Sequence, residues 1–234
     1  MLKNIVYNAI LKQGYEVSKS DTSLICNAIK VNKIDLVLDV GANKGQYSSE
    51  IRKYGYNGYI ISFEPLEEAY KVLKKKSKKD KKWEIYRRAA VGNINGKIEM
   101  NVSGNSVSSS ILNMKKTHTD IAVGSGYVGK EKVDIIKLDN IMDEIKDTYK
   151  NIFLKIDTQG YEWDVLDGAT NILQIIKGLQ CEVSLVELYE GQHLWHDVLN
   201  RIKSEGFEIW SIHKGFSDNK NGRTLQADVI FMRD

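Results

Sequence analysis

A lysine and an aspartate interrupt the end of an apolar run in the segment "LKIDTQGYEWDVL", residues 154–166. Side chains alternate across a β-strand, so Lys155 and Asp157 share one side of the strand that this run predicts. In an open α/β sheet, the carboxyl ends of the strands border the ligand crevice. A carboxylate there can accept a proton, and a lysine beside it can hold its charge or, with a depressed pKa, act as a base itself. We therefore predict Asp157 and Lys155 as catalytic residues.

A second carboxylate, Glu187, lies near the end of the later apolar run "SLVEL" and is the third predicted catalytic residue. His193 and His196 follow nearby, but isolated histidines at such places are more often surface or helix-end residues. Asp157, Glu187 and His193 are scattered along the chain and lack the regular spacing of metal ligands. We therefore predict no metal site.

Three other acids have a structural interpretation that competes with a functional one. Glu162 and Asp164 fall in the first turn of a predicted helix, where acidic side chains favour the helix dipole and cap free N–H groups. Asp139 precedes a short predicted helix at Asn140 and is equally suited to capping it. Both interpretations stay open for Glu162 and Asp139.

Glycines mark the turn "LDVGANKGQ" between the first predicted strand and helix. Gly41 and Gly45 permit a tight turn and let backbone N–H groups approach a ligand at the helix N-terminus. The Gly-x-x-x-Gly spacing fits neither the dinucleotide fingerprint nor the phosphate-binding P-loop. By itself, this turn is weak evidence for a ligand site.

An acid at the end of the second predicted strand strengthens that evidence. Glu64, in "SFEP", stands where a carboxylate can accept hydrogen bonds from two ribose hydroxyls of a nucleoside. The alternative is an acid at the start of the helix after Pro65. Asp39, two residues before the first glycine, suits a ligand with a cationic amine better than a pyrophosphate. Together these residues point to S-adenosylmethionine (SAM) rather than NAD.

The elements that position these residues alternate between strands and helices along the chain. Such alternation predicts an α/β fold with a doubly wound, mostly parallel sheet and helices on both faces. Residues 104–132 lack periodicity and predict a long active-site loop, and residues 1–33 predict a helical extension of a single domain, residues 1–234. Predicted strands lie at 36–40, 59–65, 83–91, 97–103, 133–139, 152–157, 181–188, 207–212 and 227–232, and helices at 46–55, 66–76, 140–147, 161–176 and 194–204.

Composition places the chain among ordinary globular proteins. Of its 234 residues, 42% are hydrophobic and 28% charged, and the net charge of +3 is too small to indicate a nucleic-acid partner. No apolar run reaches the roughly 18 residues of a membrane helix, and the N-terminus does not resemble a signal peptide. Two cysteines make no disulfide framework. We expect a cytoplasmic protein without membrane insertion. We also expect the basic run at 71–84 to form a solvated surface.

Several ordered motifs resemble the FkbM-type SAM-dependent methyltransferases over roughly residues 36–190. They are "VLDVGANKGQYS", "FEP", "AAVGN", "NSVSSSIL", "KLDN" and "LKIDTQGYEWDVLDGA", of which the last is the most specific. The resemblance implies a seven-stranded methyltransferase fold whose last strand is antiparallel. It also implies methyl transfer to a hydroxyl of a sugar, a glycan or another small natural product. One departure stands at Gln159, where the family usually carries a glutamate.

The resemblance also implies where SAM is held. The turn would bind its methionine end, Glu64 its ribose, and the segment from Ala89 through Ala90 to Gly92 its adenine. The family's serine pair, Ser109 and Ser110, would lie near cofactor or acceptor. The residues implied at the turn are Asp39, Gly41, Ala42, Asn43 and Gly45.

Other functions stay open. An RNA methyltransferase is one, although no Asn/Asp-Pro-Pro-Tyr/Phe element follows the fourth strand and the tetrad of ribose methylators is incomplete. An inactive SAM-binding protein is another. The expected partner is a small-molecule or glycan hydroxyl acceptor rather than a nucleic acid, and a homodimer is possible.

Overall fold

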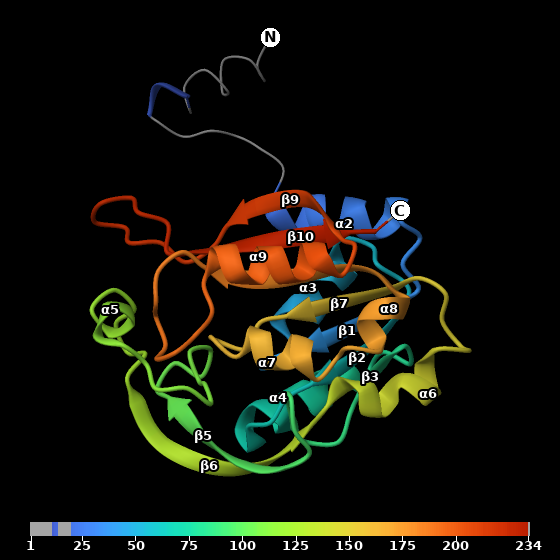
Figure 1. Ribbon diagram of the computed structural model, residues 1–234, viewed down its shortest axis with the longest axis horizontal. Helices are drawn as coiled ribbons and strands as arrows, with labels where there is room; N and C mark the ends of the chain where they lie inside the picture. The colour runs from blue at the N-terminus through green and yellow to red at the C-terminus, as the bar shows by residue number, and fades with distance from the viewer. Residues whose placement is uncertain (1–10, 14–19, 234) are drawn as a thin grey trace.

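The computed structural model describes residues 11–13 and 20–233, so most of the expected N-terminal extension lies outside the described residues. Its centre is a seven-stranded sheet in the order β3-β2-β1-β7-β8-β10-β9 (Figure 1). The strands from β3 to β8 are parallel to one another, and β10 runs antiparallel to both of its neighbours. The predicted fold class is thereby confirmed. The strands are β1 (Leu36–Val40), β2 (Tyr59–Phe63), β3 (Trp83–Ile85), β7 (Ile152–Ile156), β8 (Ile176–Ser184), β9 (Glu208–Lys214) and β10 (Gln226–Met232).

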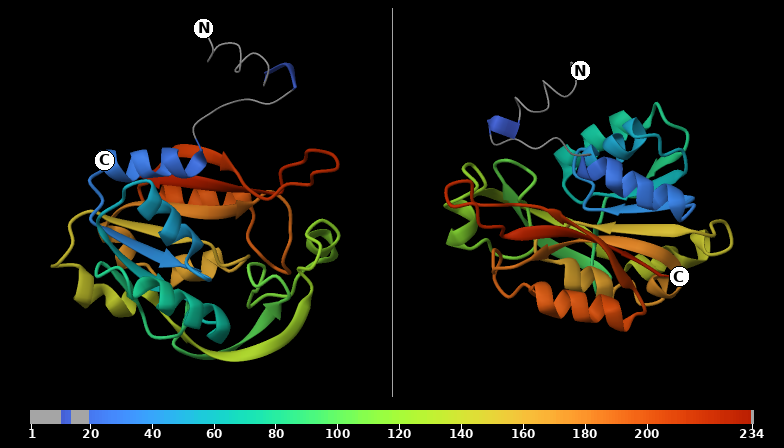
Figure 2. Two further views of the ribbon diagram at one scale, coloured as in Figure 1. Left: turned by 180° about the vertical axis from the view of Figure 1, so that it is seen from behind. Right: turned by 90° about the horizontal axis from the view of Figure 1, so that it is seen from above.

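Helices cover both faces of this sheet (Figure 2). One face packs against α2 (Asp21–Val31), α3 (Gln46–Lys53) and α4 (Glu67–Ser77). The opposite face packs against η1 (Leu138–Ile141), α6 (Met142–Ile145), α7 (Glu162–Asp167), α8 (Ile172–Ile175) and α9 (Trp195–Ser204). In the described residues, no helix is long and apolar enough to span a membrane.

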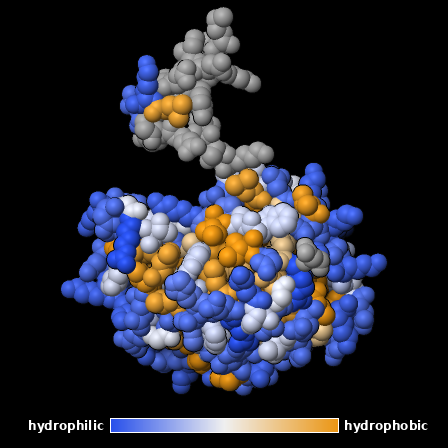
Figure 3. Space-filling view, turned by 45° about the horizontal axis from the view of Figure 1, so that its top comes forward, coloured by the Kyte–Doolittle hydropathy of each residue, from blue (hydrophilic) through white to orange (hydrophobic). Residues whose placement is uncertain are grey.

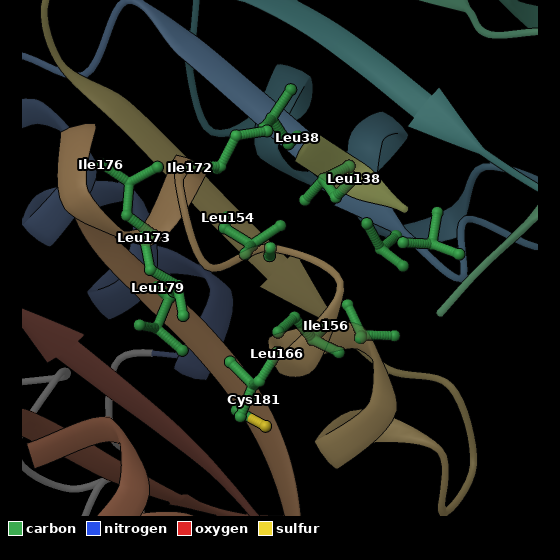
Figure 4. Packing of buried hydrophobic residues seen from close by; sticks show 14 of the residues in the cluster. Leu38, Leu138, Leu154, Ile156, Leu166, Ile172, Leu173, Ile176, Leu179 and Cys181 are labelled. Atoms are coloured by element: carbon green, nitrogen blue, oxygen red, sulfur yellow. The ribbon is translucent and has the colours of Figure 1, made fainter. Parts of the chain in front are cut away.

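Alternation along the strands divides the core into two layers. Leu38 and Leu154 point to the layer of α7, α8 and α9, where they meet Leu166, Ile172 and Leu179 (Figure 4). Each such fully buried side chain contributes about 2 kcal/mol of hydrophobic stabilisation. The intervening strand residues face α2, α3 and α4 instead. This alternation decides which strand residues can reach the site described below.

The helix predicted over 161–176 is two short helices, α7 and α8. Gly168 lies between them, and a Cβ there would lie 1.9 Å from the carbonyl oxygen of Gly92, so the chain bends where it passes that loop. Asp139 accepts hydrogen bonds from the N–H groups of Asn171 and Ile172 at 3.0 and 2.9 Å. It therefore caps α8 rather than the helix that follows it in sequence.

A second sheet of three strands, in the order β4-β6-β5, extends beneath the first (Figure 1). It consists of β4 (Ala90–Val91), β5 (Gly96–Ser103) and β6 (Tyr127–Ile136). The segment predicted as one strand over 83–91 thus supplies β3 and β4 to different sheets. The predicted loop 104–132 also ends early, because β6 begins at Tyr127 and a short helix, α5 (Lys116–Thr119), lies within it. The strand predicted at 133–139 matches only the second half of β6. The first half escaped prediction because it is largely exposed and carries charged residues instead of an apolar alternation.

β9 forms one edge of the large sheet and exposes apolar side chains. Trp210 is 52% and Ile212 54% exposed. Figure 3 shows the molecule with the top of Figure 1 turned forward. Apolar side chains gather near the middle of the face seen in that view. The site lies elsewhere, at the carboxyl ends of the central parallel strands.

Candidate active site

A row of polar residues crosses four adjacent strands in register. Ser62 in β2 pairs with Asp39 in β1, Asp39 with Lys155 in β7, and Lys155 with Gln180 in β8. All four lie on the α2 and α3 face of the sheet and are at most 5% exposed. Buried polar groups are costly unless they find partners, so such a row is kept only where its members satisfy one another or a ligand.

Lys155 is the cation of this row. Its Nζ lies 3.4 Å from a carboxylate oxygen of Asp39 and 3.4 Å from one of Asp157, and it donates to the carbonyl oxygen of Gly41 at 3.1 Å. Burial by itself would lower the pKa of Lys155, but the charges of Asp157 and Asp39 outweigh it and hold that pKa above its ordinary value. Lys155 is therefore charged at neutral pH and unsuited to act as a base.

Asp157 follows β7 directly and is the more accessible member of the pair that it forms with Lys155, with a side chain 37% exposed. One of its oxygens faces Lys155, and the other accepts a hydrogen bond from the Gln159 amide at 2.9 Å. The same amide nitrogen lies 2.9 Å from Glu182, and the Tyr189 hydroxyl donates to the Gln159 carbonyl oxygen at 2.9 Å. Gln159 thus joins two carboxylates that would otherwise repel each other.

Glu162 holds the turn that carries Asp157. One oxygen of Glu162 accepts hydrogen bonds from the N–H groups of Thr158 and Gly160 at 2.9 and 3.1 Å. Burial raises the pKa of Glu162 to about 7, although these backbone hydrogen bonds oppose the shift. Asp164 has a different contact, accepting a hydrogen bond from Asn93 at 2.7 Å. Both acids are structural supports of the turn and its helix.

The glycine turn between β1 and α3 lies directly against the end of β7. Gly41 has φ +78°, and a Cβ on it would lie 1.8 Å from the carbonyl oxygen of Asp157. Asn43 also has positive φ, and its side chain donates to the carbonyl oxygen of Ser106 at 3.1 Å. The turn therefore lies against the end of β7 on one side and is hydrogen-bonded to the long loop on the other.

Glu64 lies beside this turn and is 4% exposed. Its two oxygens accept hydrogen bonds from the N–H groups of Asn43 and Leu66, both at 2.8 Å. Burial raises the pKa of Glu64 to about 7, against the effect of those hydrogen bonds. Leu66 is the residue before α4, so Glu64 binds the start of that helix, as the alternative interpretation of the sequence predicted. Glu64 also lines the cavity.

One cavity of about 440 Å³ brings most of the predicted residues together. Apolar side chains near Glu64 line one part of it, and buried polar groups near Lys155 line the other. Nine predicted residues line it, namely Gly41, Ala42, Asn43, Glu64, Ala89, Ala90, Ser109, Lys155 and Asp157.

Four predicted residues do not reach the cavity wall. Asp39 is fully buried, accepts a hydrogen bond from Ser48 at 2.7 Å and lies 3.4 Å from Lys155, so it contacts Lys155 and not the cavity. Gly45 would place a Cβ 2.8 Å from Leu73, which makes it a packing residue. The other two are Ser110, which donates to the backbone carbonyl oxygen of Gln159 at 2.6 Å, and Glu187, which pairs with Lys115 at 2.5 Å beyond the end of β8.

The sequence analysis did not identify several residues of the cavity wall, among them Tyr47 in α3, Gln180 in β8 and Asp228 in β10. Gln180 and Asp228 are polar residues inside apolar strands, which is the same signal that identified Lys155. Within the described part of the chain, no cluster of three or more His, Cys, Asp or Glu side chains is arranged to hold a metal ion.

The model of the methyltransferase FkbM domain matches residues 39–209. A comparison with curated proteins found no match in sequence. Among solved structures, an rRNA methylase from Streptococcus thermophilus is similar in fold, with a TM-score of 0.51 and 10% identity over 93% of this chain and 98% of that one.

Two further structures are similar at lower scores. TehB from Haemophilus influenzae has a TM-score of 0.49 and 10% identity, covering 97% of this chain and 67% of that one. A putative tRNA (m1A22) methyltransferase from Streptococcus pneumoniae, in complex with SAM, has a TM-score of 0.49 and 12% identity over 92% of this chain and 73% of that one. At these identities the structures show the fold alone, and the family follows from the domain match. The chain belongs to the FkbM methyltransferase family.

Proposed function

We propose that the protein is a SAM-dependent O-methyltransferase that acts on a hydroxyl group of a sugar, a glycan or another small natural product. The observation that carries this proposal is the position of Asp157. Its carboxylate lies at the carboxyl end of β7, beside the charged Lys155, and faces the same cavity as Glu64 and the glycine turn.

The residues of the cavity fit SAM. Glu64 has a lone pair free on each oxygen beyond its backbone hydrogen bonds, which suits two ribose hydroxyls. Phe63, Leu66 and the short strand β4 provide an apolar wall for an adenine ring. The glycine turn lies against the end of β7 and would border the methionine end of SAM. When bound, SAM supplies an electrophilic methyl group.

Asp157 is the proposed proton acceptor. An alcohol oxygen is a poor nucleophile at neutral pH, so transfer requires a group that takes its proton as the new bond forms. Lys155 lies 3.4 Å from one carboxylate oxygen of Asp157, and the Gln159 amide donates to the other at 2.9 Å, so both contacts fix the orientation of the carboxylate. Because Lys155 itself stays protonated, it positions the base instead of replacing it.

The charge of the cavity argues against an RNA acceptor. Five carboxylate residues line it, and among the described lining residues Lys155 is the only cationic side chain. Proteins that bind nucleic acids place arginine and lysine along the phosphate backbone. The carboxylates of this cavity would instead repel the phosphates. A neutral or cationic small molecule fits the same surface.

Calorimetry with SAM and S-adenosylhomocysteine, followed by a radiolabelled methyl-transfer screen over glycans, small alcohols and RNA, tests the proposal. We expect cofactor binding and transfer to a non-phosphorylated hydroxyl compound, with Asp157→Asn reducing turnover at unchanged cofactor affinity. Asp143→Asn, at an exposed carboxylate, is the matched control. Binding without turnover on any acceptor would favour an inactive SAM-binding protein, and transfer to RNA alone would refute the acceptor class.

A further inference from the structure

Two buried polar atoms in the wall of the cavity have no partner among the described residues. They are the side-chain carbonyl oxygen of Gln180 and the hydroxyl of Tyr47. Gln180 is 5% exposed and projects from β8 on the α2 and α3 face of the sheet. A buried polar atom without a partner costs about 1–3 kcal/mol, so its persistence indicates a ligand that completes it.

The amide orientation of Gln180 follows from its neighbour. Its nitrogen donates to a carboxylate oxygen of Asp228 at 3.0 Å, which leaves the carbonyl oxygen as the free end. The second oxygen of Asp228 has no hydrogen bond among the described residues. The free side-chain oxygens of Gln180 and Asp228 can therefore only accept hydrogen bonds.

The cation nearby is already engaged. Lys155 is shared among Asp39, Asp157 and the carbonyl oxygen of Gly41. Asp21 and Glu50, from α2 and α3, add two more carboxylates to the rim. A ligand group that satisfies this part of the cavity must donate several hydrogen bonds and carry positive charge.

We propose that Gln180, Asp228 and Tyr47 form a subsite for a primary ammonium group, an inference that rests on the proposed function. An ammonium has three N–H donors and no acceptor, which matches two free acceptor oxygens and one hydroxyl. The group is either the α-ammonium of the methionine end of SAM or an amine on the methyl acceptor. In the first case, this subsite takes the role that the sequence assigned to Asp39, which is fully buried.

Four probes separate these sources by calorimetry on the full chain. S-adenosylhomocysteine carries the amino acid group, and methylthioadenosine lacks it. Glucosamine carries a primary amine, and N-acetylglucosamine lacks one; both sugars are titrated into the protein saturated with S-adenosylhomocysteine. The variants are Asp228→Asn, which removes the charge, and Gln180→Met, which removes the free carbonyl oxygen. Asp143→Asn is the control.

A cofactor ammonium predicts that both variants weaken S-adenosylhomocysteine about tenfold or more and leave methylthioadenosine unchanged, since a hydrogen bond to a charged group contributes about 1.5–3 kcal/mol. Unchanged methylthioadenosine binding also shows that the variant is folded. An acceptor amine predicts unchanged binding of both nucleosides and at least a tenfold loss for glucosamine alone. Either result supports the subsite.

Equal affinities of wild type and both variants for all probes would overturn the ammonium subsite and leave the proposed function intact. A wild-type protein that binds neither nucleoside would instead overturn the proposed function. The two failures are thus distinguishable in one set of titrations.

Discussion

The carbonyl oxygen of Asp157 occupies the space that a side chain at Gly41 would need, since a Cβ there would lie 1.8 Å away. The glycine turn and the end of β7 are therefore in direct backbone contact. A change at either residue moves both the proposed cofactor contacts and the proposed base.

Gly41→Ala should therefore lower the free energy of unfolding through two effects. A left-handed backbone costs a residue with a Cβ about 1–2 kcal/mol, and the clash with the Asp157 carbonyl oxygen should add to that loss. Gly55→Ala is the matched control, because Gly55 has φ +92° but a Cβ added to it would meet nothing within 4 Å. Urea unfolding measures both. Equal losses in the two variants would contradict the importance of the backbone contact.

Replacing Lys155 with methionine should destabilise the protein by about 3–5 kcal/mol, because it leaves Asp39 as an uncompensated buried charge. The double variant with Asp39→Asn should recover part of the loss. Chemical denaturation of the two single variants and the double variant gives the coupling free energy. Simple additivity would show that Lys155 and Asp39 do not interact.

Gln159→Glu should shift the proposed methyl transfer to higher pH values. The change exchanges an amide donor for a carboxylate between Asp157 and Glu182, each 2.9 Å from the amide nitrogen. Repulsion among three acids opposes the ionised form of the cluster. Burial and the neighbouring carboxylates already raise the pKa of Glu182. The pH profile of kcat, with Gln159→Met as a neutral control, measures the shift; coincident profiles for the variant and wild type would rule out this coupling.

The pKa of Glu64 predicts a dependence of stability on pH. Burial raises it to about 7, above the value of about 4.3 in an unfolded chain, so the folded state binds the extra proton between these values. Stability from this group is full below about pH 4.3 and is lost as pH rises to about 7. Glu64→Gln should therefore flatten the decline of the unfolding free energy between pH 5 and pH 7.5, in urea titrations at each pH. An identical slope in wild type and variant would refute the shift.

The same residue predicts the opposite dependence for cofactor binding. Ribose hydroxyls donate best to an ionised carboxylate, so affinity for S-adenosylhomocysteine should rise as pH increases through about 7. Glu64→Gln should weaken binding at pH 8 by about 10-fold, corresponding to about 1.5 kcal/mol for a hydrogen bond to a charged group. Calorimetry across this pH range checks both the direction and the loss.

Local patterns were sufficient to predict the large sheet. Strands that are buried on both faces, such as Leu36–Val40, appear in the sequence as continuous apolar runs bounded by glycine. Lys155 stands out because a charged residue in such a run requires a partner. The seven strands and the cavity residues Glu64 and Asp157 follow from these signals.

The remaining features depend on contacts between distant segments. Asp228 reaches Gln180 only because β10 inserts beside β8, and no local pattern encodes that pairing. Gly45 and Asp39 share a motif with true lining residues, yet the packing of Leu73 and the register of β1 turn them inward. Glu187 was placed at a strand end, but β8 ends earlier, at Ser184.

The position of β10 also has a consequence for synthesis of the protein. It is the last strand of the sheet along the chain, yet it lies between β8 and β9, both of which the ribosome makes first. Until β10 is synthesised, the edges of β8 and β9 that it will cover have no strand partner. An unpaired strand edge can form hydrogen bonds with a wrong strand. Because Asp228 arrives with β10, the acidic wall of the cavity is completed only when this last strand enters the sheet.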